Sequence, residues 1–220
     1  MLRKIFRGFW KNFTGFFTIP ALLLHLLAIL ATYLLVQSGF DWWYYQSTRG
    51  IFLLGLPAGI IGFFVPILVP AILLLVSQVK KIKQLEIVAF AIAQAEVLAF
   101  FISIIYKTFT GRIQPEFYTH LSNIDISHDF NFGFFRHGIF WGWPSSHTAV
   151  AFALAFVIWR LFPKKQLLRY TTLVYALYIG LGVSLSIHWF SDALVGIIVG
   201  AIAGTIISQV TAKNTEGENI

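Results

Sequence analysis

The 220-residue chain contains no cysteine and little charge, with Asp, Glu, Lys and Arg together making up only 11% of its residues. The missing cysteine excludes disulfides, thiol catalysis and cysteine-ligated metal sites. An average soluble domain has about 25% charged residues, so this chain has too little polar surface to cover a soluble globule. Hydrophobic residues make up 58% of the chain, which excludes a disordered protein, because disordered chains are poor in apolar residues. The composition is that of a membrane protein.

Six apolar stretches approach or exceed the length of about 20 residues that a helix needs to cross a bilayer. They cover residues 19–38, 51–78, 84–106, 147–162, 167–187 and 190–210. The second stretch contains three prolines and predicts a kinked helix, because neighbouring helices can satisfy the freed carbonyls. We therefore expect an all-α, polytopic membrane protein, a bundle of six transmembrane helices over residues 19–210. Residues 1–18 would form a basic N-terminal segment, and residues 211–220 a polar, disordered tail.

The basic residues predict the orientation of the bundle. Most of the 16 Lys and Arg residues fall on one side of the expected spans: Arg3, Lys4, Arg7, Lys11, Lys80, Lys81, Lys83, Arg160, Lys164, Lys165, Arg169 and Lys213. The other side holds Arg49, Lys107, Arg112 and Arg136. The positive-inside rule then places both termini in the cytoplasm and the long loop 107–146 outside.

The first 17 residues, MLRKIFRGFWKNFTGFF, mix basic and aromatic side chains. This pattern fits an amphipathic helix lying along the cytoplasmic membrane surface. It fits equally well a basic flank that precedes the first span. The sequence alone does not separate these two interpretations.

Two features inside the expected spans concern helix packing. Gly196, Gly200 and Gly204 recur every four residues, and small residues at that spacing let helices approach closely. We expect this close packing inside one bundle rather than at a dimer interface.

Glu96 lies about 16 Å along its helix from Lys107, too far for direct contact. A structural hydrogen bond from Glu96 to another helix is favoured over a catalytic role.

Three polar clusters lie at the outer ends of the expected helices. In the string WGWPSSHTAV, Pro144 is followed by Ser145, Ser146 and His147, which predicts a helix start with a serine cap. Backbone N–H groups exposed at a helix start bind anions, and hydroxyls and an imidazole there suit a phosphate. The same string is also an ordinary helix start.

The second cluster is SLSIHWFSDALVG, in which His188 and Asp192 are four residues apart. A carboxylate bonded to one imidazole nitrogen fixes the tautomer and frees the other nitrogen as a base or nucleophile. Alternatively, Asp192 caps a helix and His188 is an interfacial residue. The third cluster, KTFTGRIQP, places Lys107 and Arg112 at the outer face, where they either meet an anionic partner or snorkel from a helix end.

Together the three clusters resemble the type 2 phosphatidic acid phosphatase family, which also includes vanadium haloperoxidases and glucose-6-phosphatase. The family signature is Lys, six residues, Arg-Pro; then Pro-Ser-Gly-His; then Ser-Arg, five residues, His, three residues, Asp. The matching strings here are KTFTGRIQP, PSSH and LGVSLSIHWFSD. The resemblance covers residues 50–210 in outline and implies a bundle of six transmembrane helices with an outward-facing active site.

The resemblance also implies a role for each matching residue. His188 corresponds to the nucleophile that forms a phosphohistidine, Asp192 to the residue that orients it, and His147 to the general acid. Lys107 corresponds to the lysine that binds phosphate. Ser145 and Ser146 fall at the serine and glycine of the second motif, beside the phosphate. The family uses no metal or other cofactor for this hydrolysis, so cations and N–H donors must carry the transition-state charge.

The chain departs from the family at both arginines that would clamp the phosphate. Gln114 stands at the arginine of the first motif, and Gly182 at that of the third. Arg112 and Arg136 are the outward arginines near the motifs, and a forked guanidinium suits the missing role. Gly182 predicts open space, so we expect a loop arginine to enter there, Arg136 more readily than Arg112.

We therefore expect a membrane lipid phosphatase that hydrolyses a phosphomonoester or diphosphate such as phosphatidic acid, phosphatidylglycerol phosphate or a polyprenyl diphosphate. Two alternatives remain: a lipid phosphotransferase, and a non-catalytic protein that binds or moves lipid. Nucleic acid is not expected as a partner, because the basic residues follow membrane topology instead of gathering on one surface. The expected location is the plasma (inner) membrane, with the site on its extracytoplasmic face.

Overall fold

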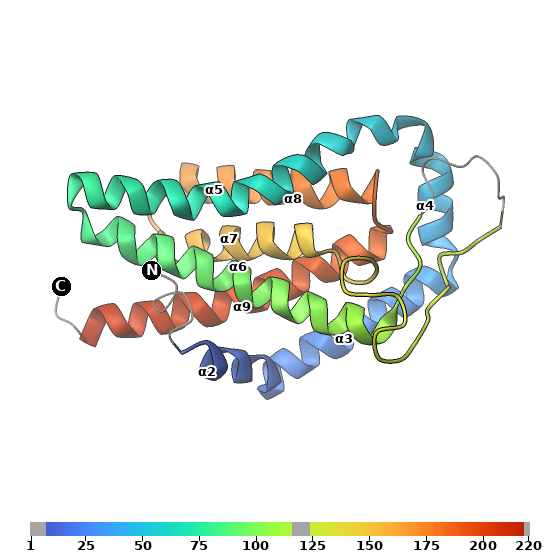
Figure 1. Ribbon diagram of the computed structural model, residues 1–220, viewed down its shortest axis with the longest axis horizontal. Helices are drawn as coiled ribbons and strands as arrows, with labels where there is room; N and C mark the ends of the chain where they lie inside the picture. Colours follow the sequence, from blue (N-terminus) through green and yellow to red (C-terminus); the bar gives the residue numbers. More distant parts are fainter. Residues whose placement is uncertain (1–7, 116–123, 218–220) are drawn as a thin grey trace.

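The computed structural model describes residues 8–115 and 124–217, with side chains up to residue 214, and all of its regular elements are helical. Six helices form a bundle (Figure 1): α3 (Ile19–Gln37), α5 (Leu56–Lys80), α6 (Lys83–Thr110), α7 (Ser146–Leu161), α8 (Gln166–Ser184) and α9 (Phe190–Gly217). Four short elements accompany them: α2 (Phe9–Thr14), η1 (Gly15–Phe17), α4 (Phe40–Thr48) and η2 (Arg49–Leu54). The predicted all-helical fold is confirmed.

Within the described residues, five helices are long and apolar enough to cross a membrane: α3, α5, α6, α8 and α9. The sixth expected span, α7, has 16 residues. At 1.5 Å per residue it reaches about 24 Å, less than the hydrocarbon thickness of about 30 Å. Helix α5 begins five residues later than expected, because residues 49–54 form the 3-10 helix η2. It then runs unbroken through Pro66 and Pro70.

Helix α7 occupies the centre of the bundle and packs against α6, α8 and α9 (Figure 1). The glycine stripe of α9 faces α7 of the same chain. A Cβ atom at Gly200 would lie 2.3 Å from the carbonyl oxygen of Ala149, and one at Gly196 would lie 2.7 Å from that of Ser145. The expectation of close packing inside one bundle is confirmed, since only glycine lets these two backbones meet.

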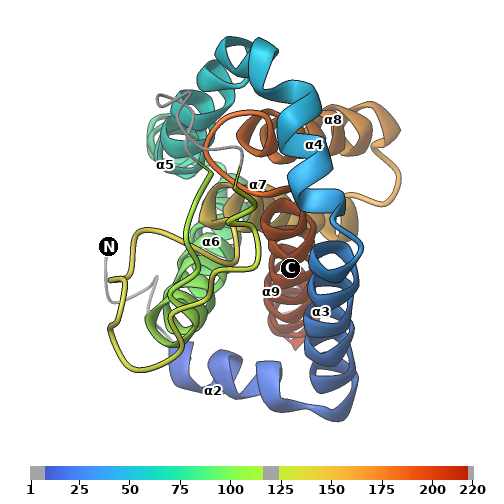
Figure 2. The same ribbon diagram turned by 90° about the vertical axis from the view of Figure 1, so that its right-hand side faces the viewer.

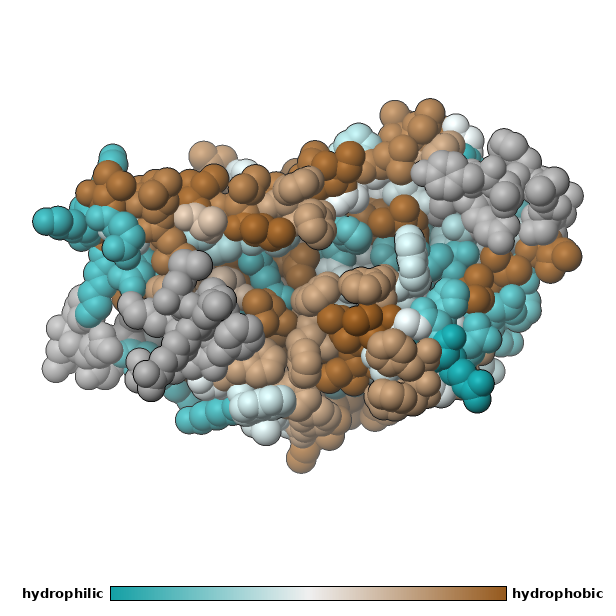
Figure 3. Space-filling view, viewed as in Figure 1, coloured by the Kyte–Doolittle hydropathy of each residue, from teal (hydrophilic) through white to brown (hydrophobic). Residues whose placement is uncertain are grey.

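The outer helices leave their apolar side chains uncovered. Only 17% of the most apolar window of α3, and 17% of that of α5, is buried inside the protein. Figure 3 shows the hydrophobic strip along α5, with a recess below it in which hydrophilic side chains are visible. Helices α3 and α5 therefore present a surface suited to lipid chains.

Helix α2 packs crosswise against the bundle (Figure 2). Phe9, Trp10 and Phe13 make edge-on contacts with Phe101 of α6, at ring-centroid distances of 5.4, 6.4 and 5.7 Å. The aromatic residues of the N-terminal segment thus contact a membrane helix directly. Its basic residues Arg3, Lys4 and Arg7 lie outside the described residues, as does His120 in the loop that joins α6 to α7.

One end of the bundle carries α4 and the long loop that joins α6 to α7 (Figure 1). The chain leaving α6 pairs with a later part of this loop. Ile113 N donates to Asp129 O at 2.9 Å, and Asn131 N donates to Gly111 O at 3.2 Å. These bonds hold residues 111–115 over the ends of α7 and α9, where the three polar clusters meet.

Candidate active site

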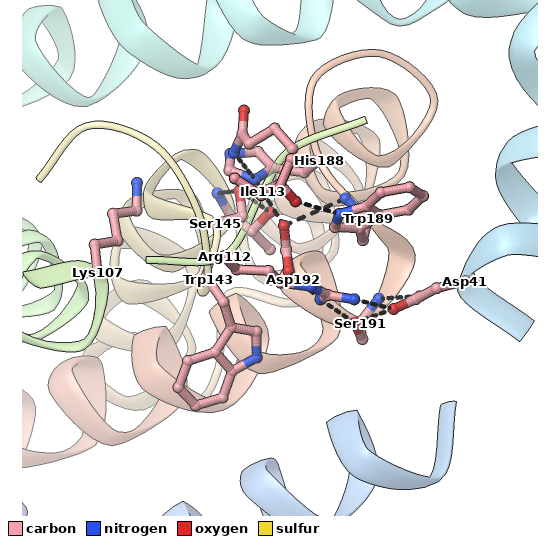
Figure 4. Close-up of polar contacts among 12 residues, drawn as sticks. Asp41, Lys107, Arg112, Ile113, Trp143, Ser145, His188, Trp189, Ser191 and Asp192 are labelled. Atoms are coloured by element: carbon pink, nitrogen blue, oxygen red, sulfur yellow. Dashed lines mark hydrogen bonds and ion pairs between the residues drawn. The ribbon is translucent and has the colours of Figure 1, made fainter. Parts of the chain in front are cut away.

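The structure brings the three clusters of the sequence together at this end of the bundle (Figure 4). Lys107 lies in the last turn of α6, and His147 in the first turn of α7. His188 lies in the turn between α8 and α9, and Asp192 in the first turn of α9. Residues 85 positions apart in the sequence, from 107 to 192, therefore share one site.

His188 is held by its Nδ1 atom. The turn that carries it closes with the His188 N–H donating to Val183 O at 2.9 Å, and only 3% of the residue is exposed. Nδ1 lies 3.2 Å from Asp192 Oδ2, which also accepts from Trp189 N at 3.3 Å. An Nδ1–H that donates to the carboxylate leaves Nε2 unprotonated, as a nucleophile requires.

Burial is the main influence on the pKa of His188. It lowers this pKa below the ordinary 6.5, because an uncharged imidazole is favoured away from water. The hydrogen bond and charge of Asp192 act in the opposite direction, and Lys107 and Arg112 add to the lowering. The net result is an imidazole that stays neutral at pH values where a solvent-exposed histidine begins to protonate.

Gln114, at the family's arginine position, also contacts the His188 ring. With the amide oriented to satisfy its hydrogen bonds, Oε1 accepts from His188 Nδ1 at 3.0 Å and from Gly142 N at 3.1 Å. Nε2 then donates to Ile187 O at 2.7 Å. Gln114 therefore assists in fixing the imidazole, while it supplies no charge for a phosphate.

Arg112 is fully buried, and its guanidinium contacts two carboxylates. Nη1 donates to Asp192 Oδ1 at 2.6 Å and to Ser191 Oγ at 2.7 Å. Nη2 donates to Asp41 Oδ2 at 2.7 Å and, with Nε, to the carbonyl of Ser127 at 2.6 and 3.0 Å. All five N–H groups are occupied, so none is left for a phosphate.

Asp41 is the partner that the sequence did not reveal. It is fully buried in α4, where its Oδ1 accepts from Ser191 N at 2.9 Å and its Oδ2 accepts from the Ser191 hydroxyl. In the sequence, Asp41 follows Gly39 at the start of a short helix, where acidic residues are common. Nothing in that pattern connects it with residues more than 70 positions away.

The start of α7 is built as predicted for a serine-capped helix. Ser145 Oγ accepts from Thr148 N at 3.4 Å, and Ser145 N donates to the backbone carbonyl of Asp192 at 3.0 Å. The Ser146 hydroxyl and His147 Nδ1 are buried and have no hydrogen-bond partner among the described residues. The rings of His147 and His188 lie 6.2 Å apart at an angle of 64°. Two buried polar groups at the start of α7 thus lack a partner among the described residues, and one of them belongs to the ring that lies next to His188.

The positions of the cationic side chains differ from the expectation that a loop arginine would enter the site. Lys107 is buried, and its Nζ donates to Phe140 O at 3.1 Å. Arg136 is exposed, and its side chain lies against Gly133 of its own loop. The space expected at Gly182 is absent: a Cβ there would lie 2.2 Å from that of Ala58, so α5 fills the place into which a guanidinium was to enter.

Other expectations concern metals and the membrane interior. Among residues 8–115 and 124–217, no group of three or more His, Cys, Asp or Glu residues is arranged to hold a metal ion. Glu96 is buried, and its Oε1 has no hydrogen-bond partner in the described part of the chain. Through Oε1, the structural hydrogen bond expected for Glu96 is therefore not formed with any described residue.

Comparison with known protein families gives a match over a large part of the bundle. A family model described as the PAP2 superfamily matches residues 85–216, which include nearly all of α6 and α9, the whole of α7 and α8, and every residue of the three clusters. No curated protein and no solved structure matches the chain. The matched segment begins after α4, so it does not include Asp41.

Proposed function

The chain belongs to the PAP2 superfamily, and on that premise we propose that it is a membrane phosphatase that hydrolyses a lipid phosphomonoester or diphosphate. The observation that carries this proposal is the placement of His188. Asp192 and Gln114 both accept from its Nδ1, and the His147 ring lies 6.2 Å from its ring. This leaves Nε2 of His188 as the free nucleophilic atom.

The proposed reaction has two steps. His188 Nε2 attacks phosphorus, the bond to the lipid oxygen or leaving phosphate breaks, and His147 gives the leaving oxygen a proton. Water then attacks the phosphorus of the phosphohistidine while His147 takes up a proton, the P–Nε2 bond breaks, and inorganic phosphate leaves with His188 restored. No metal or cofactor enters either step.

We assign the stabilisation of the negative charge on the phosphoryl group to Lys107 and to the start of α7. The buried Lys107 supplies a cation, and the unpartnered Ser146 hydroxyl supplies a donor. Ser145 holds the N-terminal turn of α7 in place through its cap. Arg112 and Arg136 are not assigned to phosphate binding. The guanidinium of Arg112 is hydrogen-bonded to two carboxylates, and Arg136 is exposed on its loop.

The proposed location is the plasma (inner) membrane, with both termini in the cytoplasm and the site on the extracytoplasmic face. Two features support this. Most of the described basic residues lie at the helix ends opposite the site, among them Lys80, Lys83, Arg160 and Lys165. The exposed apolar faces of α3 and α5 suit surrounding lipid.

The test is phosphate release by the purified protein from a panel of phosphatidic acid, phosphatidylglycerol phosphate and polyprenyl diphosphate in detergent. We expect release from at least one lipid, unchanged in EDTA, inhibited by vanadate and abolished by His188→Ala. Inclusion of an alcohol acceptor would reveal a phosphotransferase as a new phosphorylated product. Binding of these lipids without any phosphate release would identify a non-catalytic lipid-binding protein instead.

A further inference from the structure

We infer that Asp41, which lies outside the family-matched segment, is a positioning residue that sets the geometry and charge of the nucleophile through Arg112 and Asp192. The inference rests on the proposed function of the site. It concerns a chain of hydrogen-bonded side chains, Asp41, Arg112, Asp192 and His188, which we call the relay. The motifs and the family match do not contain its first member, Asp41. Figure 4 shows the side chains of this relay following one another from Asp41 through Arg112 and Asp192 to His188.

The relay is continuous and buried throughout. Arg112 lies between the two carboxylates, 2.7 Å from Asp41 Oδ2 and 2.6 Å from Asp192 Oδ1. All three side chains are 0% exposed. Because water does not reach these groups, each hydrogen bond is stronger than it would be at the surface, and each unpaired partner would be costly.

Asp192 uses its two oxygens for different partners. Oδ1 faces Arg112, while Oδ2 accepts from His188 Nδ1. The direction of the carboxylate, and with it the rotation of the imidazole, therefore depends on where Arg112 is held. Arg112 is in turn held from the far side by Asp41 and by the carbonyl of Ser127.

The charges of the relay give Asp41 a second effect. Two carboxylates share one guanidinium, so the three groups together carry a net negative charge. When His188 Nε2 bonds to phosphorus, its ring gains positive charge, which a negative partner at Nδ1 stabilises. With Asp41 neutral, the whole charge of Arg112 would act on Asp192 and weaken that stabilisation.

The packing of α4 agrees with this role. The Tyr45 ring makes an edge-on contact with Trp189, the residue after the nucleophile, at 5.6 Å. The Phe40 ring contacts Phe190 at 5.2 Å. Asp41 lies between these contacts in the sequence, so α4 is fixed against the turn that carries His188.

A pH profile can detect the relay because few charged or titratable groups surround His188. Among the described residues they come from four elements: Lys107 of α6, Arg112 after α6, His147 of α7 and Asp192 of α9. The polar partners of Asp41 are Arg112 and Ser191, and it has no hydrogen bond or ion pair with His188. A shift of the acid limb on its neutralisation would therefore have to pass through Arg112 and Asp192.

The experiment compares Asp41→Asn with Asp41→Glu, using the purified full chain and the lipid that the wild-type protein hydrolyses. Asp129→Asn, at a half-exposed loop carboxylate, is the matched control. We expect Asp41→Asn to lower kcat about tenfold or more, with little change in KM, because the reacting groups are misplaced. Its acid limb of kcat/KM should move to lower pH. Asp41→Glu keeps the charge, so it should lower kcat while its acid limb stays in place.

Several outcomes would overturn the inference. One is a folded Asp41→Asn protein with wild-type kcat per folded molecule and an unmoved acid limb, which would make Asp41 merely structural. Another is an Asp41→Glu protein whose acid limb of kcat/KM moves or whose kcat is unchanged. If Asp41→Asn does not fold, Asp41→Glu alone decides the question. A wild-type protein without phosphatase activity would refute the proposed function, an outcome distinct from both.

Discussion

Asp192 divides its carboxylate between His188, whose Nδ1 lies 3.2 Å from Oδ2, and Arg112, whose Nη1 lies 2.6 Å from Oδ1. The buried guanidinium of Arg112 therefore binds the carboxylate of the residue that contacts His188. The imidazole is fixed at one nitrogen and open at the other. The predictions that follow test the roles that this arrangement gives to His188, His147 and the arginines.

Replacement of the two histidines should impair hydrolysis in different ways. We expect His147→Ala to regain activity on a phosphate ester with an acidic phenol as leaving group, because such a group departs without a proton. His188→Ala should stay inactive on both substrates, since no phosphohistidine can form. Hydrolysis of a phenyl ester and an alkyl lipid phosphate by each variant measures this. Equal rescue of both variants would contradict the assigned roles.

The pH profile should reflect a neutral nucleophile. Protonation of Nε2 would block attack, and burial lowers the pKa of His188 below 6.5. We therefore expect the acid limb of kcat/KM, which reports the free enzyme, to have its midpoint below pH 6.5. The substrate phosphate itself titrates at about pH 6 and must be corrected for. A midpoint above 6.5 would show that the histidine is more easily protonated than its burial allows.

The loop arginine should matter little. Arg136 and Arg49 are both exposed, and Ala58 closes the space at Gly182 that a guanidinium would need. We expect Arg136→Ala and Arg49→Ala to reduce kcat/KM by similar, small factors. A large loss for Arg136→Ala alone would mean that its loop closes over the phosphate during turnover.

The glycine stripe should be essential to stability. Alanine is favoured over glycine in a helix by about 1 kcal/mol, yet a methyl group at Gly200 would lie 2.3 Å from Ala149 O and 2.7 Å from Phe152 Cβ. Overpacking of this kind costs about 1–3 kcal/mol or more, so we expect Gly200→Ala to lower the melting temperature. Gly50→Ala is the control, because nothing lies within 4 Å of its Cβ position. A melting temperature at or above the wild-type value for Gly200→Ala would show that α7 and α9 are less tightly packed.

Much of the fold could be predicted from hydrophobic length alone, because a bilayer requires long apolar helices. The start of α7 was also predictable, since the serine cap and the preceding proline are local signals. Residues 40–48 were not predicted to be a helix, because FDWWYYQST is short and lies between spans. The contacts that connect this helix with the site, from Asp41 to Arg112 and Ser191, are tertiary and leave no local signal in the sequence.

The site was predictable only where its residues fit a motif. The pairing of His188 with Asp192 followed from their spacing, whereas the direction of Arg112 did not, because it is set by two carboxylates distant in the sequence. The expectation of open space at Gly182 was wrong for a related reason. A missing side chain can be replaced by a neighbouring helix, and α5 approaches there.

The central claim is that His188 becomes covalently phosphorylated during turnover. The most direct measurement is to mix the purified protein with a lipid substrate labelled in its phosphate, stop the reaction in alkaline denaturant, and locate the label by mass spectrometry. We expect phosphate on His188 of the wild-type protein, stable in base and lost in acid, and none in His188→Ala. Turnover without label on His188, or label that persists in His188→Ala, would contradict the account.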